Sequence, residues 1–158
     1  MRSLVVYYSR TGNAKFVAEK VASELKADTE EVVDLKNRRG WFGFLRAGYD
    51  ATRSKETKIE TTQKLPKDYD LIVVGSPVWN SRLTPAIRTY LKDNDLSGKK
   101  VAIFSTNEGM GNEKTLAMIR SLIPRGNVIG ELGVSKVLEN QADAESKISA
   151  WCNNLKSI

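Results

Sequence analysis

The chain has 158 residues, with 25 lysines and arginines against 19 aspartates and glutamates, which gives a formal net charge of +6. This length predicts a single domain covering residues 1–158, because domains usually contain about 100 to 150 residues or somewhat more. Hydrophobic residues make up 41% of the chain and charged residues 28%, a balance that can form a buried core and argues against disorder. The longest apolar runs, such as residues 4–8, fall far short of the roughly 20 residues of a membrane-spanning helix. We therefore expect no transmembrane segment, and we expect no signal peptide.

The sequence contains no histidine and a single cysteine, Cys152. The absence of histidine excludes Ser-His-Asp and Cys-His catalysis, HExxH metal sites and any histidine general base. One cysteine cannot form an internal disulfide or a multi-thiol metal site, so we expect a cytoplasmic protein without a bound metal. Ile148, Trp151, Cys152 and Leu155 recur at helical spacing. This pattern predicts that Cys152 is an unreactive apolar residue on the core-facing side of the last helix.

Apolar runs alternate with stretches of helical period along the whole chain. Residues 4–8 predict a buried first strand, and the apolar residues from Val17 to Leu25 predict the helix that follows it. Residues 29–35 predict a more amphipathic strand at a sheet edge, whereas the continuous apolar run at residues 71–74 predicts a central strand. The next predicted elements are a helix with Thr84 as its cap and Pro85 as its first residue, and a strand at residues 101–104. A helix then follows that is capped by Asn112, carries Ile123 and is ended by Pro124. The last two elements are a strand at about residues 128–134 and the final helix.

Five strands that alternate with helices predict an α/β domain with a doubly wound parallel sheet between two helical layers. Ligands of such sheets bind beyond the carboxyl ends of the strands, near the point where the strand order reverses. The loops after the first, third and fourth strands are therefore the candidate functional segments.

The first of these loops is polar and leads directly into a helix. Its residues are Ser9, Arg10, Thr11, Gly12, Asn13 and Ala14. Hydroxyl and amide side chains, a glycine and the free N–H groups of a helix's first turn suit a phosphate group. The loop lacks the GxxxxGK[ST] and GxGxxG patterns, which argues against nucleoside triphosphate hydrolysis and Rossmann-type NAD binding. The alternative is an ordinary capped turn in which Ser9 or Asn13 serves the helix alone.

The second candidate loop contains Ser76, Pro77, Val78, Trp79 and Asn80. A tryptophan at the ligand edge of a sheet presents a flat face on which an aromatic ring system can stack. The alternative is that Trp79 covers the core as a lid.

The third candidate loop runs from Ser105 to Asn112 and is polar and rich in glycine. It is longer than a simple connection requires, so its backbone can present N–H and C=O groups to the edge of a heterocycle. The alternative here is a plain turn with a helix cap.

Together, the three loops resemble those of flavodoxins, over roughly residues 3–157. Residues 9–14 resemble the phosphate-binding loop of the family, in which Thr or Ser, any residue, Thr, Gly, Asn and Thr follow one another. Ala14 departs from that pattern, since most members carry a hydroxyl at its position. The resemblance implies a flavodoxin-like three-layer sandwich, with a five-stranded parallel sheet in the order 2-1-3-4-5 and helices on both faces.

The resemblance also implies FMN as the cofactor. It assigns the phosphate to residues 9–14. The isoalloxazine ring is assigned to the loop of Ser76, Pro77, Val78, Trp79 and Asn80, with Trp79 against the ring. The pyrimidine edge is assigned to the backbone of Thr106, Asn107 and Gly109. In the family, a backbone carbonyl after the third strand accepts a hydrogen bond from the reduced flavin, and the residue that carries it changes conformation. Glycine often serves there, but Asn80 tolerates a positive φ and is our candidate here. Arg82 and Arg10 would make the second reduction potential less negative than in an acidic relative, whereas a merely solvated Arg82 would not.

Residues 36–60 are unusually basic, with seven lysines and arginines against three acidic residues. Trp41, Leu45, Gly48 and Tyr49 lie at helical spacing, which predicts the second helix that covers the sheet. This segment could overhang the flavin site or form a dimer contact. Its basic and aromatic residues also fit single-stranded nucleic acid, an anionic membrane surface or an acidic redox partner, but a core helix with a solvated basic face is the interpretation we favour.

The function that these patterns favour is an FMN-binding electron carrier of flavodoxin type that exchanges electrons with redox partner proteins. One alternative is an FMN-dependent NAD(P)H or quinone reductase on the same fold, which needs a second substrate pocket. Another is a flavin-free module that binds a different phosphate ligand. Phosphorylation of the response-regulator kind is disfavoured, because the first strand ends in Ser9 with no carboxylate cluster nearby.

Overall fold

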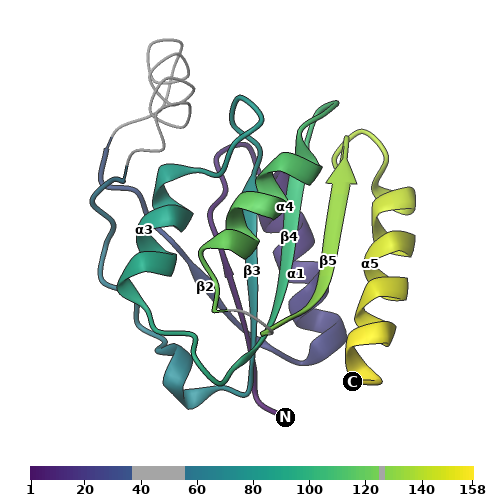
Figure 1. Cartoon of the computed structure of the whole chain (residues 1–158). Coiled ribbons are helices and arrows are strands. Elements are labelled where there is room, and N and C mark those ends of the chain that lie inside the picture. The colour runs from purple at the N-terminus through teal and green to yellow at the C-terminus, as the bar shows by residue number, and fades with distance from the viewer. Residues whose placement is uncertain (37–55, 125–126) are drawn as a thin grey trace.

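A parallel sheet of five strands forms the centre of the molecule, in the order β2-β1-β3-β4-β5. The computed structural model describes residues 1–36, 56–124 and 127–158. The strands are β1 (Ser3–Tyr7), β2 (Asp28–Glu31), β3 (Leu71–Pro77), β4 (Lys100–Asn107) and β5 (Val128–Ser135). Because all neighbouring pairs are parallel, their carboxyl ends share one edge of the sheet, at the top of Figure 1. The predicted strand order is confirmed.

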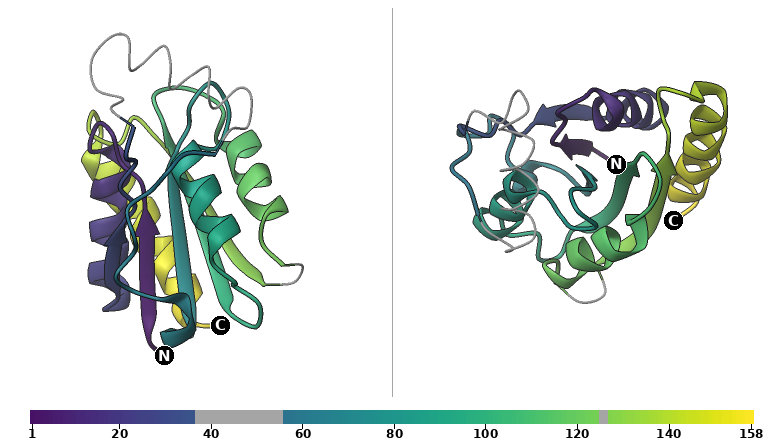
Figure 2. Two further views of the ribbon diagram at one scale, coloured as in Figure 1. Left: turned by 90° about the vertical axis from the view of Figure 1, so that its left-hand side faces the viewer. Right: turned by 90° about the horizontal axis from the view of Figure 1, so that it is seen from above.

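Helices cover both faces of this sheet and complete the predicted three layers. They are α1 (Asn13–Leu25), α3 (Pro85–Asp93), α4 (Asn112–Ser121) and α5 (Gln141–Lys156), with a short 3₁₀ helix, η1 (Pro66–Asp68). The views in Figure 2 show α1 and α5 on one side of the sheet and α3 and α4 on the other. A predicted second helix on Trp41, Leu45, Gly48 and Tyr49 lies outside the described residues.

The alternation of side chains along the strands divides the core into two halves. In β1, Leu4 and Val6 join the core cluster beneath α3 and α4, whereas Val5 and Tyr7 join the cluster beneath α1 and α5. All four are buried. A strand covered on both faces needs apolar residues at every position, which explains why the central strands are continuous apolar runs.

The edge strand β2 is shorter than the sequence predicts. It ends at Glu31, and the chain then forms an isolated antiparallel bridge between Asp34 and Ile59. The N–H of Leu35 donates to the carbonyl of Lys58 at 2.9 Å. The predicted edge position is confirmed, but residues 33–35 pair with a later segment instead of extending β2.

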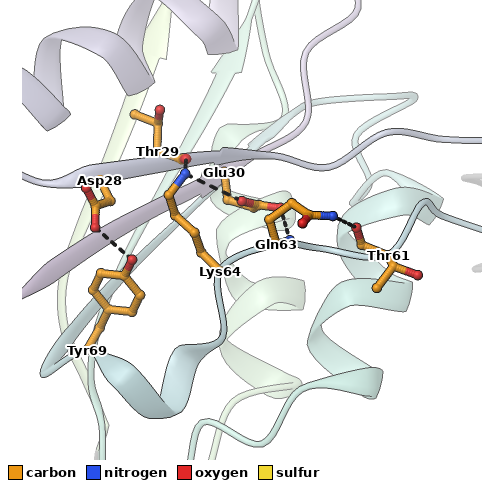
Figure 3. Close-up of polar contacts among 7 residues, drawn as sticks. All are labelled: Asp28, Thr29, Glu30, Thr61, Gln63, Lys64 and Tyr69. Atoms are coloured by element: carbon orange, nitrogen blue, oxygen red, sulfur yellow. Dashed lines mark hydrogen bonds and ion pairs between the residues drawn. The ribbon is translucent and has the colours of Figure 1, made fainter.

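The segment before β3 is hydrogen-bonded to β2 (Figure 3). Three bonds reach β2: Lys64 Nζ donates to the Thr29 carbonyl at 2.8 Å, Gln63 N to Glu30 Oε1 at 2.7 Å, and Tyr69 Oη to Asp28 Oδ2 at 2.7 Å. Within the segment, Gln63 Nε2 donates to the Thr61 carbonyl at 3.3 Å. The Glu30 side chain is buried and Lys64 lies 3.9 Å from its second oxygen. These contacts protect a sheet edge that would otherwise offer free backbone groups to another strand.

One predicted helix cap is confirmed in its position and the other differs in the structure. Thr84 occupies the N-cap position of α3, but its side chain makes no capping bond, because its Oγ1 lies 3.0 Å from the Ser76 hydroxyl. The N-cap of α4 is Gly111 instead of Asn112, which is the first helical residue and accepts a bond from Ser105 Oγ at 2.7 Å. The prediction that Asn112 caps this helix was therefore wrong, because the Asn112 side chain is hydrogen-bonded to Ser105 of β4 instead.

The end of α4 also comes earlier than the sequence predicts. The helix ends at Ser121, before Ile123 and Pro124. Ile123 is nevertheless buried in the core beneath α3 and α4. Its apolar character therefore reflects packing beyond the helix and not helical period.

Candidate functional site

The three predicted loops meet around one cavity of about 200 Å³, beyond the carboxyl ends of β1, β3 and β4. Its lining residues are Arg10, Thr11, Asn13, Pro77, Val78, Trp79, Thr106, Asn107 and Glu108. All but Glu108 are candidate residues from the sequence. The structure therefore brings the three loops together as the fold requires, although Ser9, Gly12, Ala14, Ser76, Asn80 and Gly109 do not line this cavity.

The first loop turns sharply into α1. Gly12 is the N-cap residue with a φ of 97°, a conformation that glycine adopts without strain. Its N–H donates to Ser9 Oγ at 3.2 Å, so the Ser9 hydroxyl accepts a bond from its own loop. The methyl group of Ala14 is buried in the core beneath α1 and α5. The N–H groups in the first turn of α1 have no partners within the helix and remain available to an anion.

Asn13 connects three loops that are far apart in sequence. Its Nδ2 donates to Thr11 Oγ1 at 3.1 Å and to Glu108 Oε1 at 2.8 Å, and its Oδ1 accepts from Leu138 N at 3.3 Å. Sequence reasoning missed Glu108, although a carboxylate in the middle of a candidate loop was a visible signal. Glu108 places negative charge beside a loop whose donors suit an anion.

A tight turn follows β3. Trp79 and Arg82 exchange two backbone hydrogen bonds of 3.0 Å, and between them Asn80 and Ser81 have φ values of 50° and 56°. Two-residue turns with a positive φ at both central residues are typical of hairpins. The predicted tolerance of Asn80 for a positive φ is confirmed. The redox-linked change of conformation at Asn80 remains a prediction.

Trp79 forms a wall of the cavity and also covers part of the core. Its side chain is half-buried and packs against the cluster beneath α3 and α4. Its ring meets that of Tyr8 edge-on, with centroids 5.4 Å apart and an interplanar angle of 86°. The interpretation that Trp79 covers the core is thus confirmed, and its stacking against a ligand ring stays a prediction.

Ser76 supports the loop from beneath. It is fully buried, and its hydroxyl donates to the Pro77 carbonyl at 2.9 Å and contacts Thr84 Oγ1. This residue stabilises the path of the chain from β3 to α3 and does not reach the cavity.

The end of β4 carries two buried side-chain oxygens that form no hydrogen bond with the described residues. The carbonyls of Thr106 and Asn107 accept bonds of 2.8 Å from the N–H groups of Val78 and Lys136. Thr106 Oγ1 and Asn107 Oδ1, in contrast, are buried with no hydrogen-bond partner among the described residues. Because buried polar atoms are almost always paired, these two atoms in the cavity wall fit a ligand that supplies polar partners.

Other chemistry finds less support in the described part of the chain. Cys152 is fully buried in α5; burial raises the pKa of its thiol to about 11, with a further increase from Glu24 and a decrease from Lys156. No cluster of three or more histidine, cysteine, aspartate or glutamate residues suited to a metal ion occurs among residues 1–36, 56–124 and 127–158. In the same ranges, none of the helices combines the length and apolar character needed to cross a membrane.

Comparisons with known proteins agree with this geometry. The flavodoxin family model matches residues 45–155. A flavoprotein from Lactobacillus acidophilus, solved in complex with FMN, is 25% identical, and the match covers 95% of this chain and 97% of that one with a TM-score of 0.73. The oxidised flavodoxin 2 from Bacillus cereus shares the fold, with 17% identity, 99% coverage of each chain and a TM-score of 0.66. This chain belongs to the flavodoxin family.

Proposed function

We propose that this protein binds FMN and transfers electrons between redox partner proteins. The observation that carries this proposal is the convergence of three loops on one cavity, with the unpaired oxygens of Thr106 and Asn107 in its wall. Membership of the flavodoxin family and the similarity to an FMN-bound flavoprotein support FMN as the cofactor. FMN, when bound, supplies the redox chemistry, and the protein binds it, orients it and tunes its potentials.

The loop of residues 9–14 is the proposed phosphate site. Thr11, Asn13 and Arg10 line the cavity and carry hydrogen-bond donors, and the first turn of α1 adds N–H groups. Charge-assisted hydrogen bonds contribute roughly 1.5–3 kcal/mol each, and the helix dipole adds up to about 2 kcal/mol. These contributions suffice for binding even though Ala14 offers no hydroxyl.

The other two loops are the proposed site of the ring system. The indole of Trp79, with Pro77 and Val78 beside it, provides the apolar wall. The pyrimidine edge would meet the side-chain oxygens of Thr106 and Asn107 together with the backbone of Gly109. This assignment differs from a purely backbone one, because the carbonyls of Thr106 and Asn107 already accept bonds within the protein.

The decisive experiment combines reconstitution with FMN and an anaerobic potentiometric titration. We expect one FMN per chain and two separate one-electron midpoint potentials. Failure to retain flavin after reconstitution would overturn the proposal. A single two-electron transition would argue against the role of an electron carrier while leaving FMN binding intact.

We further propose that the protein acts in the cytoplasm with acidic partners, since it has a single cysteine, which is buried, and a net charge of +6. Electron transfer with an acidic partner should slow when salt is added, because salt screens attraction between exposed charges. A rate that is independent of salt would contradict an electrostatic docking step.

A second candidate function is an FMN-dependent NAD(P)H or quinone reductase. The observation that favours it is a separate groove of about 630 Å³ that begins at Asn80, directly after Trp79. A reductase needs such a second pocket, whereas an electron carrier does not. Prompt bleaching of the bound flavin by NADH or NADPH alone would support this function, and slow bleaching would argue against it.

A further inference from the structure

A groove beside the candidate FMN site has no role in electron transfer. It lies between the turn after β3 and the middle of α4 and has a volume of about 630 Å³. Its lining residues are Asn80, Ser81, Arg82, Lys114, Ala117 and Met118. Pockets for small molecules usually have volumes of about 300–1,000 Å³ and a few convergent polar groups on an otherwise apolar wall.

Two uncompensated cations line this groove. Neither Arg82 nor Lys114 lies within ion-pair distance of a carboxylate in the part of the chain that the structure describes. Two cations of α3 and α4 do pair with carboxylates: Lys92 of α3 lies 2.9 Å from Glu56, and Arg120 of α4 pairs with Glu131. Among the described residues, no carboxylate therefore neutralises the positive charge of Arg82 and Lys114.

Arg88 adds to this positive charge. Its Nε and Nη2 atoms are buried and have no hydrogen-bond partner among the residues described. Burial lowers the pKa of the Arg88 guanidinium, Glu56 raises it, and the charge of Arg82 lowers it again. The charge of Arg82 thus acts unfavourably on that of Arg88, and an anion at Arg82 would offset this effect.

The rest of the wall suits an apolar body. Lys114, Ala117 and Met118 stand at positions i, i+3 and i+4 of α4, so they share one face of the helix. A ligand with its charge at Lys114 would extend its remaining atoms along Ala117 and the flexible thioether of Met118. Methionine adapts its shape to irregular apolar ligands and makes favourable contacts with aromatic rings.

We propose that this groove binds a small amphipathic anion, with a phosphate or carboxylate group at Arg82 and Lys114 and an apolar body along Ala117 and Met118. The site is separate from the phosphate loop of residues 9–14, with which it shares no lining residue. The proposal rests on the proposed function in one respect, because the protein is tested in its FMN-loaded form. The groove and its charges are present in the chain itself.

Ligand titrations followed by the amide resonances of the oxidised, FMN-loaded protein test this site. The probes are 1-naphthyl phosphate, 2-naphthoate and neutral 1-naphthol, which share a ring system and differ in charge. We expect saturable shifts at Asn80, Ser81, Lys114 and Met118 with at least one of the two anions, and binding at least about fivefold weaker with naphthol. Comparison of the two anions distinguishes a phosphate from a carboxylate ligand.

Charge-neutral variants provide the second arm of the test. Arg82→Gln and Lys114→Gln should each weaken binding of the anion by about fivefold. The control is Lys147→Gln, which makes the same change of charge on α5, where Lys147 pairs with Asp143 at 2.7 Å; it should leave binding unchanged. The flavin absorbance reports FMN retention independently, so loss of the proposed function and loss of this site are distinguished.

Four results would overturn the proposal. Shifts confined to residues 9–14 would mean that the anions bind only at the phosphate loop. If naphthol bound as tightly as the anions, or if both variants bound the anion as tightly as the wild type, the cations would not recognise the ligand. Binding of poly-L-glutamate that depends on Arg82 and Lys114, without binding of either small anion, would instead identify a docking surface for an acidic protein.

Discussion

Gly111 and Ser81 are in such close contact that a β-carbon on Gly111 would lie 3.0 Å from the Ser81 Cα and 2.8 Å from Val78 Cγ1. Gly111 is the N-cap of α4, whereas Ser81 is in the turn after β3. The contact therefore fixes the turn against the start of the helix. Gly111 also has a φ of 102°, a backbone conformation that residues with a side chain rarely adopt.

Replacement of this glycine should disturb both stability and the site. We expect Gly111→Ala to lower the free energy of unfolding by about 1–3 kcal/mol, since it combines a strained backbone with a clash, and to weaken FMN binding. Urea unfolding and flavin titration measure the two effects. Gly109→Ala is the matched control, because no atom lies within 4 Å of its added β-carbon. Equal stability of the two variants would contradict this account.

Removal of the charge of Glu108 should strengthen FMN binding. Glu108 Oε1 accepts a bond from Asn13 Nδ2 at 2.8 Å, which occupies one donor of the proposed phosphate loop and places like charge near a phosphate. We expect Glu108→Gln to lower the Kd for FMN about twofold to fivefold, a range typical of exposed charges. Glu113→Gln removes a charge outside the cavity and should have no effect. A weaker affinity in Glu108→Gln would instead show that the carboxylate supports the loop.

Truncation of Trp79 should weaken binding of the flavin ring. Aromatic contacts contribute about 0.5–1.5 kcal/mol beyond the apolar area that they bury, so Trp79→Ala should raise the Kd for FMN by at least about tenfold. Trp79→Phe keeps an aromatic ring and should lose less. Trp151→Phe changes a tryptophan in the core beneath α5 and should leave the Kd unchanged. A similar Kd in wild type and Trp79→Ala would exclude stacking at this position.

The turn at Asn80 offers a test of potential tuning. Asn80 has a φ of 50°, which glycine adopts readily and a β-branched residue adopts at a cost. We expect Asn80→Val to shift at least one of the two one-electron midpoint potentials by roughly 50 mV, or about 1 kcal/mol, and Asn80→Gly to shift both by less. Anaerobic potentiometry measures them. Unchanged potentials in Asn80→Val would mean that Asn80 has no part in tuning.

Burial of Cys152 predicts a loss of stability at high pH. The unfolded thiol ionises near pH 9, whereas the folded thiol stays neutral until about pH 11. Its contribution is thus complete below pH 9 and is lost as the pH rises towards 11, by up to about 3 kcal/mol. The free energy of unfolding should fall more steeply in the wild type than in Cys152→Ala over this interval. Parallel pH profiles would show that the thiol does not contribute.

The amino-acid sequence alone was enough to predict most helices and strands and the three loops of the site. Continuous apolar runs predict strands that are covered on both faces, and Leu4 to Tyr7 are indeed buried on alternating sides. The polar residues after β1, β3 and β4 were recognisable because parallel strands place their carboxyl ends at one edge. These features depend on local composition and period, which a sequence records directly.

The contacts between the loops, in contrast, depend on how the whole chain packs. The bond between Asn13 and Glu108 and the contact between Gly111 and Ser81 join segments that are distant in sequence. The unpaired oxygens of Thr106 and Asn107 and the cap of α4 by Gly111 likewise depend on which neighbours the packed loops provide. Such contacts form only when the strand register and helix packing are complete, so residue type and spacing alone do not specify them.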